Sequence, residues 1–294
     1  RFCREAELAD ATGFRARGLL TGADLAGWRA RYEAPVALDY GDWTLLKTGP
    51  WGQGPVLLQA LQILKGFDIG AMDPTGPDFA HVAVEAIKLA YADREAYYGD
   101  PDHSDIPLGA LLSDAYAAGR RGLIGEAASM EQRPGRVPGF ERLAEAAIAR
   151  AARSAGEIGA ARPEAGIGEP TMAHLGEPTM AHLARRPGDT THLDVIDRDG
   201  NMVSATPSGG WLQSSPVVPG LGFPLNNRMQ MFWLDEGLPS TLAPGRRPRT
   251  TLTPSLAWKD GRPAMVFGTP GGDQQDQWQL VFFLRVAHHV MNLQ

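Results

Sequence analysis

The chain has 294 residues, of which 43% are hydrophobic, so it can bury a substantial core as one large domain or two modest ones. Its net charge of -6 argues against a nucleic-acid partner, because phosphate binding needs clustered Lys and Arg. Cys3 is the only cysteine, which excludes an internal disulfide and a cysteine-based zinc site.

No run of residues approaches the roughly eighteen apolar residues of a membrane span. The chain begins at Arg1 without an initiator Met or the apolar core of a signal peptide, and it stops within a helical pattern. We therefore expect truncation at both ends. Location stays open, with a cytoplasmic one slightly favoured over export.

Helical periodicity dominates the first part of the chain. A helix is expected to open at Thr21, and Val56–Lys65 carries apolar residues at helical spacing. A single strand, Asp42–Lys47, separates them. The longest helical pattern runs from Pro77 to Tyr98, and a further helix is expected over Leu112–Arg121.

The composition between Gly125 and Gly188 shifts to Ala, Glu, Arg, Gly and Pro, and an eight-residue unit is repeated at 168–175 and 176–183. Two short copies are too few for a solenoid, so we interpret this segment as a flexible linker. His174 and His182 lie in the repeat and could bind a metal. The linker interpretation is preferred because no further ligands follow at useful spacing.

After Asp189 the apolar residues alternate with a period of two. One predicted hairpin spans 192–206 and another spans 254–267, each with Asp-Gly at its turn. A helical pattern follows from Gln275 to Gln294. Helices before and after an antiparallel sheet predict an α+β fold arranged as an αββα sandwich.

The common catalytic motifs are missing: the sequence has no Gly-x-Ser-x-Gly elbow, phosphate loop, His-Glu-x-x-His or dinucleotide-binding glycine motif. Four other motifs occur in order. They are Gly188-Asp-Thr-Thr-His-Leu-Asp-Val, Pro224-Leu-Asn-Asn-Arg-Met, Ala243-Pro-Gly-Arg-Arg-Pro-Arg-Thr-Thr-Leu-Thr-Pro and Gly268-Thr-Pro-Gly-Gly-Asp.

This series resembles the small subunit of the gamma-glutamyltransferase family. Upstream, Gly18-Leu-Leu-Thr-Gly-Ala-Asp-Leu and Ala90-Tyr-Ala-Asp-Arg-Glu-Ala-Tyr-Tyr-Gly-Asp-Pro resemble its large subunit. The resemblance implies an N-terminal-nucleophile hydrolase of αββα architecture without a metal or cofactor. Residues 1–124 would be the C-terminal part of the large subunit, 125–189 a linker ending at a self-cleavage site, and 190–294 the β-rich N-terminal part of the small subunit.

The resemblance also assigns roles to residues. The proenzyme would cut itself between Asp189 and Thr190, freeing an α-amine with a pKa of about 8 that can take the proton of the Thr190 hydroxyl. Gly271 and Gly272 would form the oxyanion hole, with each N–H donor contributing about 3 kcal/mol. Ser208 would orient Thr190. A tight turn at the glycines and a plain strand-end serine are the alternatives.

The family's contacts to the substrate α-amine are replaced here, since the corresponding positions hold Met231, Gly210 and Arg228. Thr250 and Thr251 replace paired serines and keep both hydroxyls. Our hypothesis is that Arg228, Thr250 and Thr251 hold a carboxylate or oxo-acid amide that lacks an α-amine. The alternative is that Arg228 pairs with a structural acid such as Asp235.

Three functions therefore remain. The resemblance implies cleavage of gamma-glutamyl amides such as glutathione, with transfer of the acyl group to water or an amine acceptor. The altered pocket and the segments starting at Gly209 and Gly272 favour a small carboxylate-bearing amide, as in the oxamate amidohydrolase-like branch. A non-catalytic family remnant is the third. His192 is interpreted as a strand residue, and Asp93 and Arg94 as a solvated or structurally paired helix face.

Overall fold

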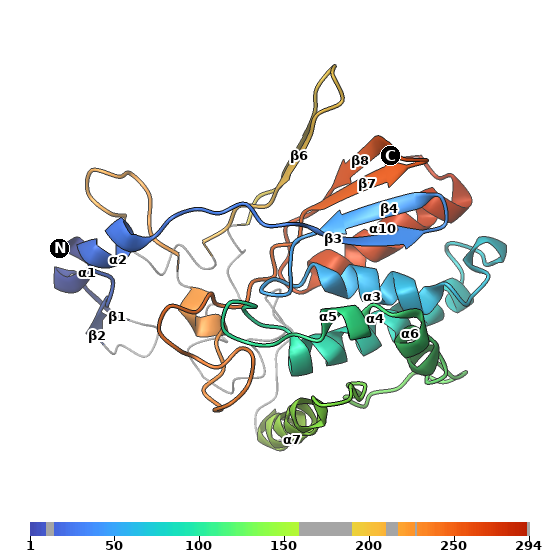
Figure 1. Cartoon of the computed structure of the whole chain (residues 1–294), viewed down its shortest axis with the longest axis horizontal. Helices are drawn as coiled ribbons and strands as arrows, with labels where there is room; N and C mark the ends of the chain where they lie inside the picture. Colours follow the sequence, from blue (N-terminus) through green and yellow to red (C-terminus); the bar gives the residue numbers. More distant parts are fainter. Residues whose placement is uncertain (10–14, 159–189, 210–216, 227, 293–294) are drawn as a thin grey trace.

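The computed structural model describes residues 1–9, 15–158, 190–209, 217–226 and 228–292 (Figure 1). The strands are β1 (Glu7–Ala9), β2 (Arg15–Arg17), β3 (Val36–Tyr40), β4 (Trp43–Lys47), β5 (Leu193–Ile196), β6 (Met202–Ala205), β7 (Ser255–Lys259) and β8 (Arg262–Phe267). The α-helices are α1 (Phe2–Glu5), α2 (Gly22–Gly27), α3 (Pro55–Leu64), α4 (Pro77–Tyr97), α5 (Leu108–Leu111), α6 (Asp114–Arg121), α7 (Glu141–Ile158) and α10 (Gln274–His289). Short 3-10 helices are η1 (Ile69–Ala71) and η3 (Arg228–Met231).

The main sheet has the strand order β3-β4-β7-β8, and all of its pairs are antiparallel. Its central pair joins β4 to β7, with Leu45 opposite Ala257. Strands from opposite ends of the chain therefore share one sheet. The segments expected on either side of the linker are halves of a single folded unit.

One face of the sheet packs on α3 and α10. Phe283 of α10 stacks on Phe267 with ring centroids 6.1 Å apart and meets the rings of Trp43 and Tyr40 edge-on. All ten residues of α3 are buried, and its two polar side chains, Gln59 and Gln62, donate to Asp93 and Asp114. Helix α4 covers α3 in the next layer, and α7 lies outside α4 (Figure 1).

The predicted helices at Thr21, 56–65, 77–98 and 112–121 are confirmed as α2, α3, α4 and α6. In α2, Thr21 and Asp24 form a capping box. Both predicted hairpins are also confirmed, as β5–β6 and β7–β8, and the predicted C-terminal helix is α10, which begins at Gln274 and ends at His289.

The strand predicted over Asp42–Lys47 is confirmed as β4, but the expectation that it is single is wrong, because β3 pairs along its whole length with β4. Leu38 and Tyr40 are buried and lie two residues apart, and this period-two spacing of apolar residues was the sequence signal for β3. Gly41 makes the tight turn between these strands with a φ of 61°.

Helix α7 was also missed, because it lies in the segment interpreted as linker. Its Ala-rich sequence is a strong helix former, and Ala144 and Ala147 are buried in the core at helical spacing. The first half of the expected linker is therefore packed structure. The rest of it, including the repeat with His174 and His182, lies outside the described residues.

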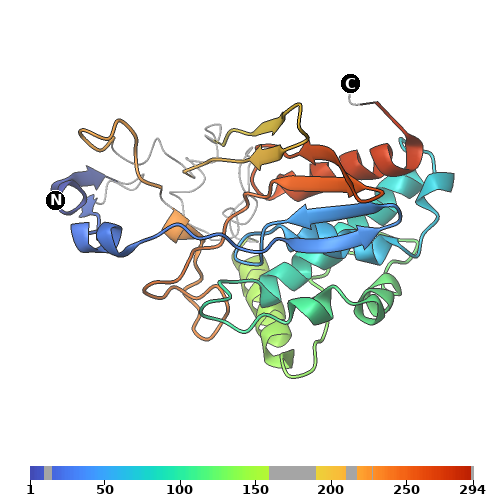
Figure 2. The same ribbon diagram turned by 45° about the horizontal axis from the view of Figure 1, so that its top comes forward.

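The α+β class is confirmed. Figure 2 shows the hairpin β5–β6 on the side of the sheet away from α3 and α4, where it contacts β7 and β8. Among the described elements, this side has no helical layer matching that of α3 and α10. The αββα sandwich stays a prediction.

A buried ion pair ties the sheet to α10. Lys47 Nζ lies 3.2 Å from Asp276 Oδ1, and neither side chain is exposed to solvent. The Lys47 amine also donates to Ser255 Oγ and the Thr253 carbonyl. Burial lowers the pKa of Lys47 and raises that of Asp276, while their mutual attraction opposes both shifts.

Lys47→Met is expected to lower the free energy of unfolding by about 3–5 kcal/mol, because it leaves the Asp276 carboxylate buried without its cation. Denaturant unfolding at neutral pH measures this. The control is Lys259→Met, whose exposed partner Asp42 lies 3.3 Å away, and it should change stability by less than about 1 kcal/mol. Equal losses in the two variants would contradict the prediction.

Candidate active site around Thr190

Hairpin register places Thr190 opposite Ser208. Strands β5 and β6 pair Leu193 with Ala205, and the ladder continues where the Thr191 N–H donates to the Pro207 carbonyl at 3.1 Å. One step further, the Thr190 hydroxyl donates to Ser208 Oγ at 3.0 Å. The predicted nucleophile and its predicted orienting residue are therefore in direct contact.

Arg228 adds a cation to this pair. It is buried, and its Nη2 donates to Ser208 Oγ at 3.0 Å. Its backbone N–H donates to Asn226 Oδ1, which fixes the start of η3. Asp235, the alternative partner considered for Arg228, instead pairs with Arg153 at 2.7 Å. Thr190, Ser208 and Arg228 form one hydrogen-bonded group, called here the threonine group.

His192 joins the hairpin to β8. Its ring nitrogens lie 2.8 Å from Thr206 Oγ1 and 2.8 Å from Asp194 Oδ2. The ring packs so closely on Gly268 that a Cβ there would meet it at 2.2 Å. Because both nitrogens have partners within the hairpin, the geometry favours a structural role for His192 over that of a general base, and the residue lies directly before β5, which begins at Leu193.

The glycine turn follows directly after this contact. Gly271 has a φ of 131° and Gly272 a φ of 59°, values that favour glycine. A Cβ on Gly271 would also lie 2.5 Å from the Trp278 ring. The turn alternative therefore accounts for both glycines, and their oxyanion role stays a prediction. The turn leads into α10, so backbone N–H groups gather at this helix end.

Thr250 and Thr251 occupy a third segment. Both are buried; Thr250 forms a parallel bridge with Gly52, and its hydroxyl accepts a hydrogen bond from the Leu252 N–H at 3.3 Å. Their role in substrate binding stays a prediction.

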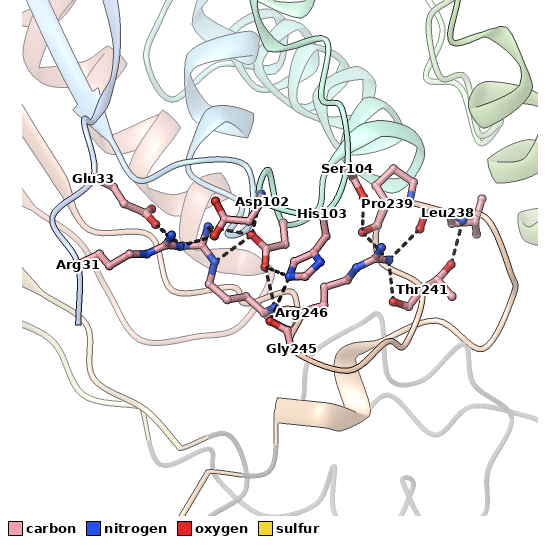
Figure 3. A network of polar contacts seen from close by, with 12 residues as sticks. Arg31, Glu33, Asp102, His103, Ser104, Leu238, Pro239, Thr241, Gly245 and Arg246 are labelled. Atoms are coloured by element: carbon pink, nitrogen blue, oxygen red, sulfur yellow. Dashed lines mark hydrogen bonds and ion pairs between the residues drawn. The ribbon is translucent and has the colours of Figure 1, made fainter. Parts of the chain in front are cut away.

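The arginines before Thr250 anchor this segment. Arg247 binds Asp100 through its backbone N–H at 2.8 Å and its guanidinium at 2.9 Å. Figure 3 shows Arg246 directed at the carbonyls of residues 238, 239 and 241, and Nη1 donates to the carbonyl of Thr241 at 2.9 Å. These cations of the Arg-Arg-Pro-Arg run hold the backbone in place.

A cluster of buried charges around Glu95 was not found from the sequence. Its carboxylate accepts from Arg94 and Arg249 at 2.6 Å and from Arg150 of α7 at 2.8 Å. The Arg150 guanidinium stacks 3.4 Å from the centre of the Trp233 ring. The helical pattern alone does not show that arginines from three distant segments meet here.

The Asp93 and Arg94 positions are structurally paired, and both side chains are buried. Asp93 binds Arg120 at 3.3 Å and accepts from the Gly135 N–H at 2.7 Å. Arg94 binds Asp273 at 2.6 Å. The solvated alternative is wrong, because α4 lies between α3 and α7 instead of at the surface.

A cavity of about 370 Å³ lies elsewhere, and none of the predicted site residues lines it. We place the candidate site at the threonine group because its reactive side chains meet there. The cavity is lined by His103, Ser104, Asp105, Gly139, Phe140, Arg142, Leu143, Gly237, Leu238, Pro239 and Arg246.

Asp189 and Gly210 lie outside the described residues, so the scissile bond is seen only from its Thr190 side. Within the described part of the chain, no three His, Cys, Asp or Glu side chains gather as metal ligands. None of the helices described there is long and apolar enough to cross a membrane.

Residues 6–294 match the gamma-glutamyltranspeptidase family model. The chain is 30% identical to a glutathione hydrolase proenzyme of Pseudomonas sp. (strain A14), covering 94% of this chain and 43% of that protein. It is 31% identical to the acylase ACY 1 proenzyme of Pseudomonas sp. (strain SE83), covering 94% and 42%. The chain thus spans less than half the length of these curated relatives.

Solved structures show the same relationship. An LmbA structure superposes with a TM-score of 0.78 and 53% identity, covering 97% of this chain and 44% of that chain. The cephalosporin acylase from Bacillus halodurans superposes with a TM-score of 0.71 and 30% identity, covering 94% and 42%.

The α+β fold shared with these neighbours is that of the N-terminal-nucleophile hydrolases. Within this class, the match along nearly the whole chain shows that the protein belongs to the gamma-glutamyltranspeptidase family.

The Glu95 cluster predicts an acid-sensitive step in stability. Burial tends to raise the pKa of Glu95, but the charges of Arg249, Arg94 and Arg150 hold it below its ordinary value of 4.5. A lowered folded-state pKa contributes stability above the unfolded-state value near 4.5, and this contribution is lost as pH falls toward the folded-state value.

Glu95→Gln should therefore flatten the fall of unfolding free energy below about pH 5, besides lowering stability at neutral pH. Denaturant unfolding at a series of pH values measures both effects. Glu145→Gln is the control, since the exposed carboxylate of Glu145 lies 3.7 Å from Arg136 at the surface. Parallel pH profiles for Glu95→Gln and the unaltered protein would contradict the prediction.

Proposed function

We propose that the whole protein is a self-processing amidohydrolase in which Thr190 is the nucleophile. The observation that carries this proposal is the threonine group, in which the Thr190 hydroxyl contacts Ser208 and Ser208 contacts the buried Arg228. Family membership supports it, since relatives are named as proenzymes of hydrolases and acylases. The large and small chains would come from one precursor.

In the first stage, the Thr190 oxygen attacks the carbonyl carbon of Asp189. The C–N bond breaks, the amide nitrogen takes up the proton, and an ester joins the two segments. Water then hydrolyses this ester, leaving a carboxylate on Asp189 and a free α-amine on Thr190. The two chains would remain together, because β4 and β7 belong to one sheet.

In the second stage, the α-amine accepts the hydroxyl proton as Thr190 Oγ1 attacks the amide carbon of the substrate. An amine of pKa about 8 is suited to this exchange near neutral pH. The N–H groups of Gly271 and Gly272 would stabilise the oxyanion, and the leaving amine departs with the proton. Water or an amine acceptor then releases the acyl group from Thr190.

Ser208 would orient the nucleophile during both stages. Its oxygen receives hydrogen bonds from Thr190 and Arg228, so the hydroxyl of Thr190 is held in one rotamer. The nearby guanidinium charge favours negative charge developing on the Thr190 oxygen.

For the substrate, we propose an amide whose acyl group bears a carboxylate but no α-amine. Met231 is buried where the family places an acidic residue, so a substrate ammonium would lose its counter-charge there. Arg228, Thr250 and Thr251 would recognise the carboxylate. Two relatives are named as acylases.

Cleavage of gamma-glutamyl amides such as glutathione is the second candidate. It is favoured by the relative named as a glutathione hydrolase, which is 30% identical over 292 residues.

Thr190→Ala in the full-length protein should remain a single chain and hydrolyse no amide, because it lacks the attacking oxygen. Intact-mass measurement and N-terminal sequencing test this. Thr191→Ala is the matched control, because the Thr191 side chain is exposed and only its backbone N–H joins the hairpin. An uncut unaltered protein would instead identify a non-catalytic family member.

Arg228→Met should lower kcat/KM about 10- to 100-fold more for a carboxylate-bearing amide than for its neutral carboxamide analogue, since charge-assisted hydrogen bonds contribute about 1.5–3 kcal/mol. Steady-state kinetics on the two substrates measure the difference. Arg228→Lys retains the charge and should show a smaller difference. Equal losses on both substrates would mean that Arg228 acts through Ser208 and does not bind the carboxylate.

A further inference from the structure

Asp273 directly follows the glycine turn and is held by Arg94 of α4. Nη1 of Arg94 donates to Oδ1 at 2.6 Å, and Nη2 donates to Oδ2 at 3.2 Å. The arginine side chain is 3% exposed and the aspartate side chain 7%. Tyr91, one helical turn before Arg94, donates its hydroxyl to the Asp273 carbonyl oxygen. Helix α4 therefore grips both the side chain and the backbone of this residue.

Arg94 is itself fixed. Its Nη1 also donates to Gln53 Oε1 at 2.6 Å, and its Nη2 donates to Glu95 Oε1 at 2.6 Å. The guanidinium carbon lies 4.5 Å from the centre of the Tyr91 ring. A buried, bidentate arginine with this many partners is held in one orientation, so the position of α4 fixes the position of the Asp273 side chain.

A second contact holds the same helix end. Asp276, three residues beyond Asp273, binds Lys47 at 3.2 Å and accepts from Thr253 Oγ1 at 2.9 Å. Gly271 and Gly272, whose N–H groups the turn presents, have no side chains that could restrain it. Its direction depends on the first turn of α10, which α4 and β4 hold from the other end of the chain.

We propose that Arg94 is a positioning residue that aims the N–H groups of Gly271 and Gly272 through Asp273. This inference rests on the proposed function, in which those groups stabilise the oxyanion. Donors act on the transition state only when their direction is set in advance. Loosening the turn should therefore lower kcat while leaving substrate binding by Arg228, Thr250 and Thr251 largely unchanged.

Arg94→Met in the processed full-length protein should lower kcat about 10- to 100-fold, with KM within about 2-fold. Arg94→Lys, which keeps the charge but not the bidentate contact, should lose less and recover processing if the methionine variant fails to mature. Asp273→Asn should lower kcat similarly. The double variant should lose no more than the worse single variant, because both act through one contact.

Arg120→Met is the matched control. Arg120 forms another buried pair with α4, to Asp93 at 3.3 Å, but lies on α6 away from the glycine turn. It should lower the melting temperature like Arg94→Met while kcat stays within about 2-fold. If Arg120→Met lowers kcat as much as Arg94→Met, the effect is general destabilisation and the inference is wrong.

Hydrogen exchange tests, independently of activity, whether Arg94 holds the glycine turn in place. In uncut Thr190→Ala protein, adding Arg94→Met should raise deuterium uptake in the peptide covering 268–274, whereas adding Arg120→Met should not. Unchanged uptake overturns the inference, as does raised uptake with an unchanged kcat. If the unaltered protein hydrolyses no amide, the proposed function is refuted. Raised deuterium uptake on adding Arg94→Met would then still show that Arg94 holds the glycine turn.

Discussion

Pairing of β4 with β7 is the constraint on which the rest of the structure depends. It joins strands more than 200 residues apart in sequence, Trp43–Lys47 and Ser255–Lys259, and makes one sheet from both ends of the chain. The core then forms on one face, where Phe283 of α10 packs on Phe267 and Trp43. Residues from both ends contribute to one core cluster, so cutting before Thr190 would leave two chains in one fold.

Local geometry builds the candidate site on that sheet. A hairpin whose register is set by its Asp-Gly turn carries Thr190 and Ser208 to opposite positions, and the ring of His192 sets the hairpin against Gly268. Arg228 reaches the same hydroxyl from η3. Each of these contacts is a single hydrogen bond or a close packing contact and cannot hold the site together alone. The site therefore depends on the sheet to position the segments that carry these residues.

Buried charges connect these segments to the helical layers. Glu95 binds arginines from α4, α7 and the loop that leads to Thr250, and Asp273 and Asp276 bind Arg94 and Lys47 at the start of α10. Removing either partner from such a pair leaves a buried charge with neither its partner nor solvent, which lowers the stability of the fold. The elements of the candidate site are therefore coupled to the helical layers through buried ion pairs.

The sequence by itself determined the periodic elements, both hairpins and the order of the four motifs, because these follow from local spacing and turn residues. It also determined the family, through motifs that include Thr190 and Gly271. Strand β3 and helix α7 were missed, although Leu38, Tyr40 and the alanines of α7 carried readable patterns. Only the tertiary structure decided that Arg228 contacts Ser208, that Asp93 and Arg94 are buried and paired, and that Arg94 holds Asp273. Those contacts join residues far apart in the chain. The local sequence around a charged residue does not show whether its side chain faces solvent or a buried partner.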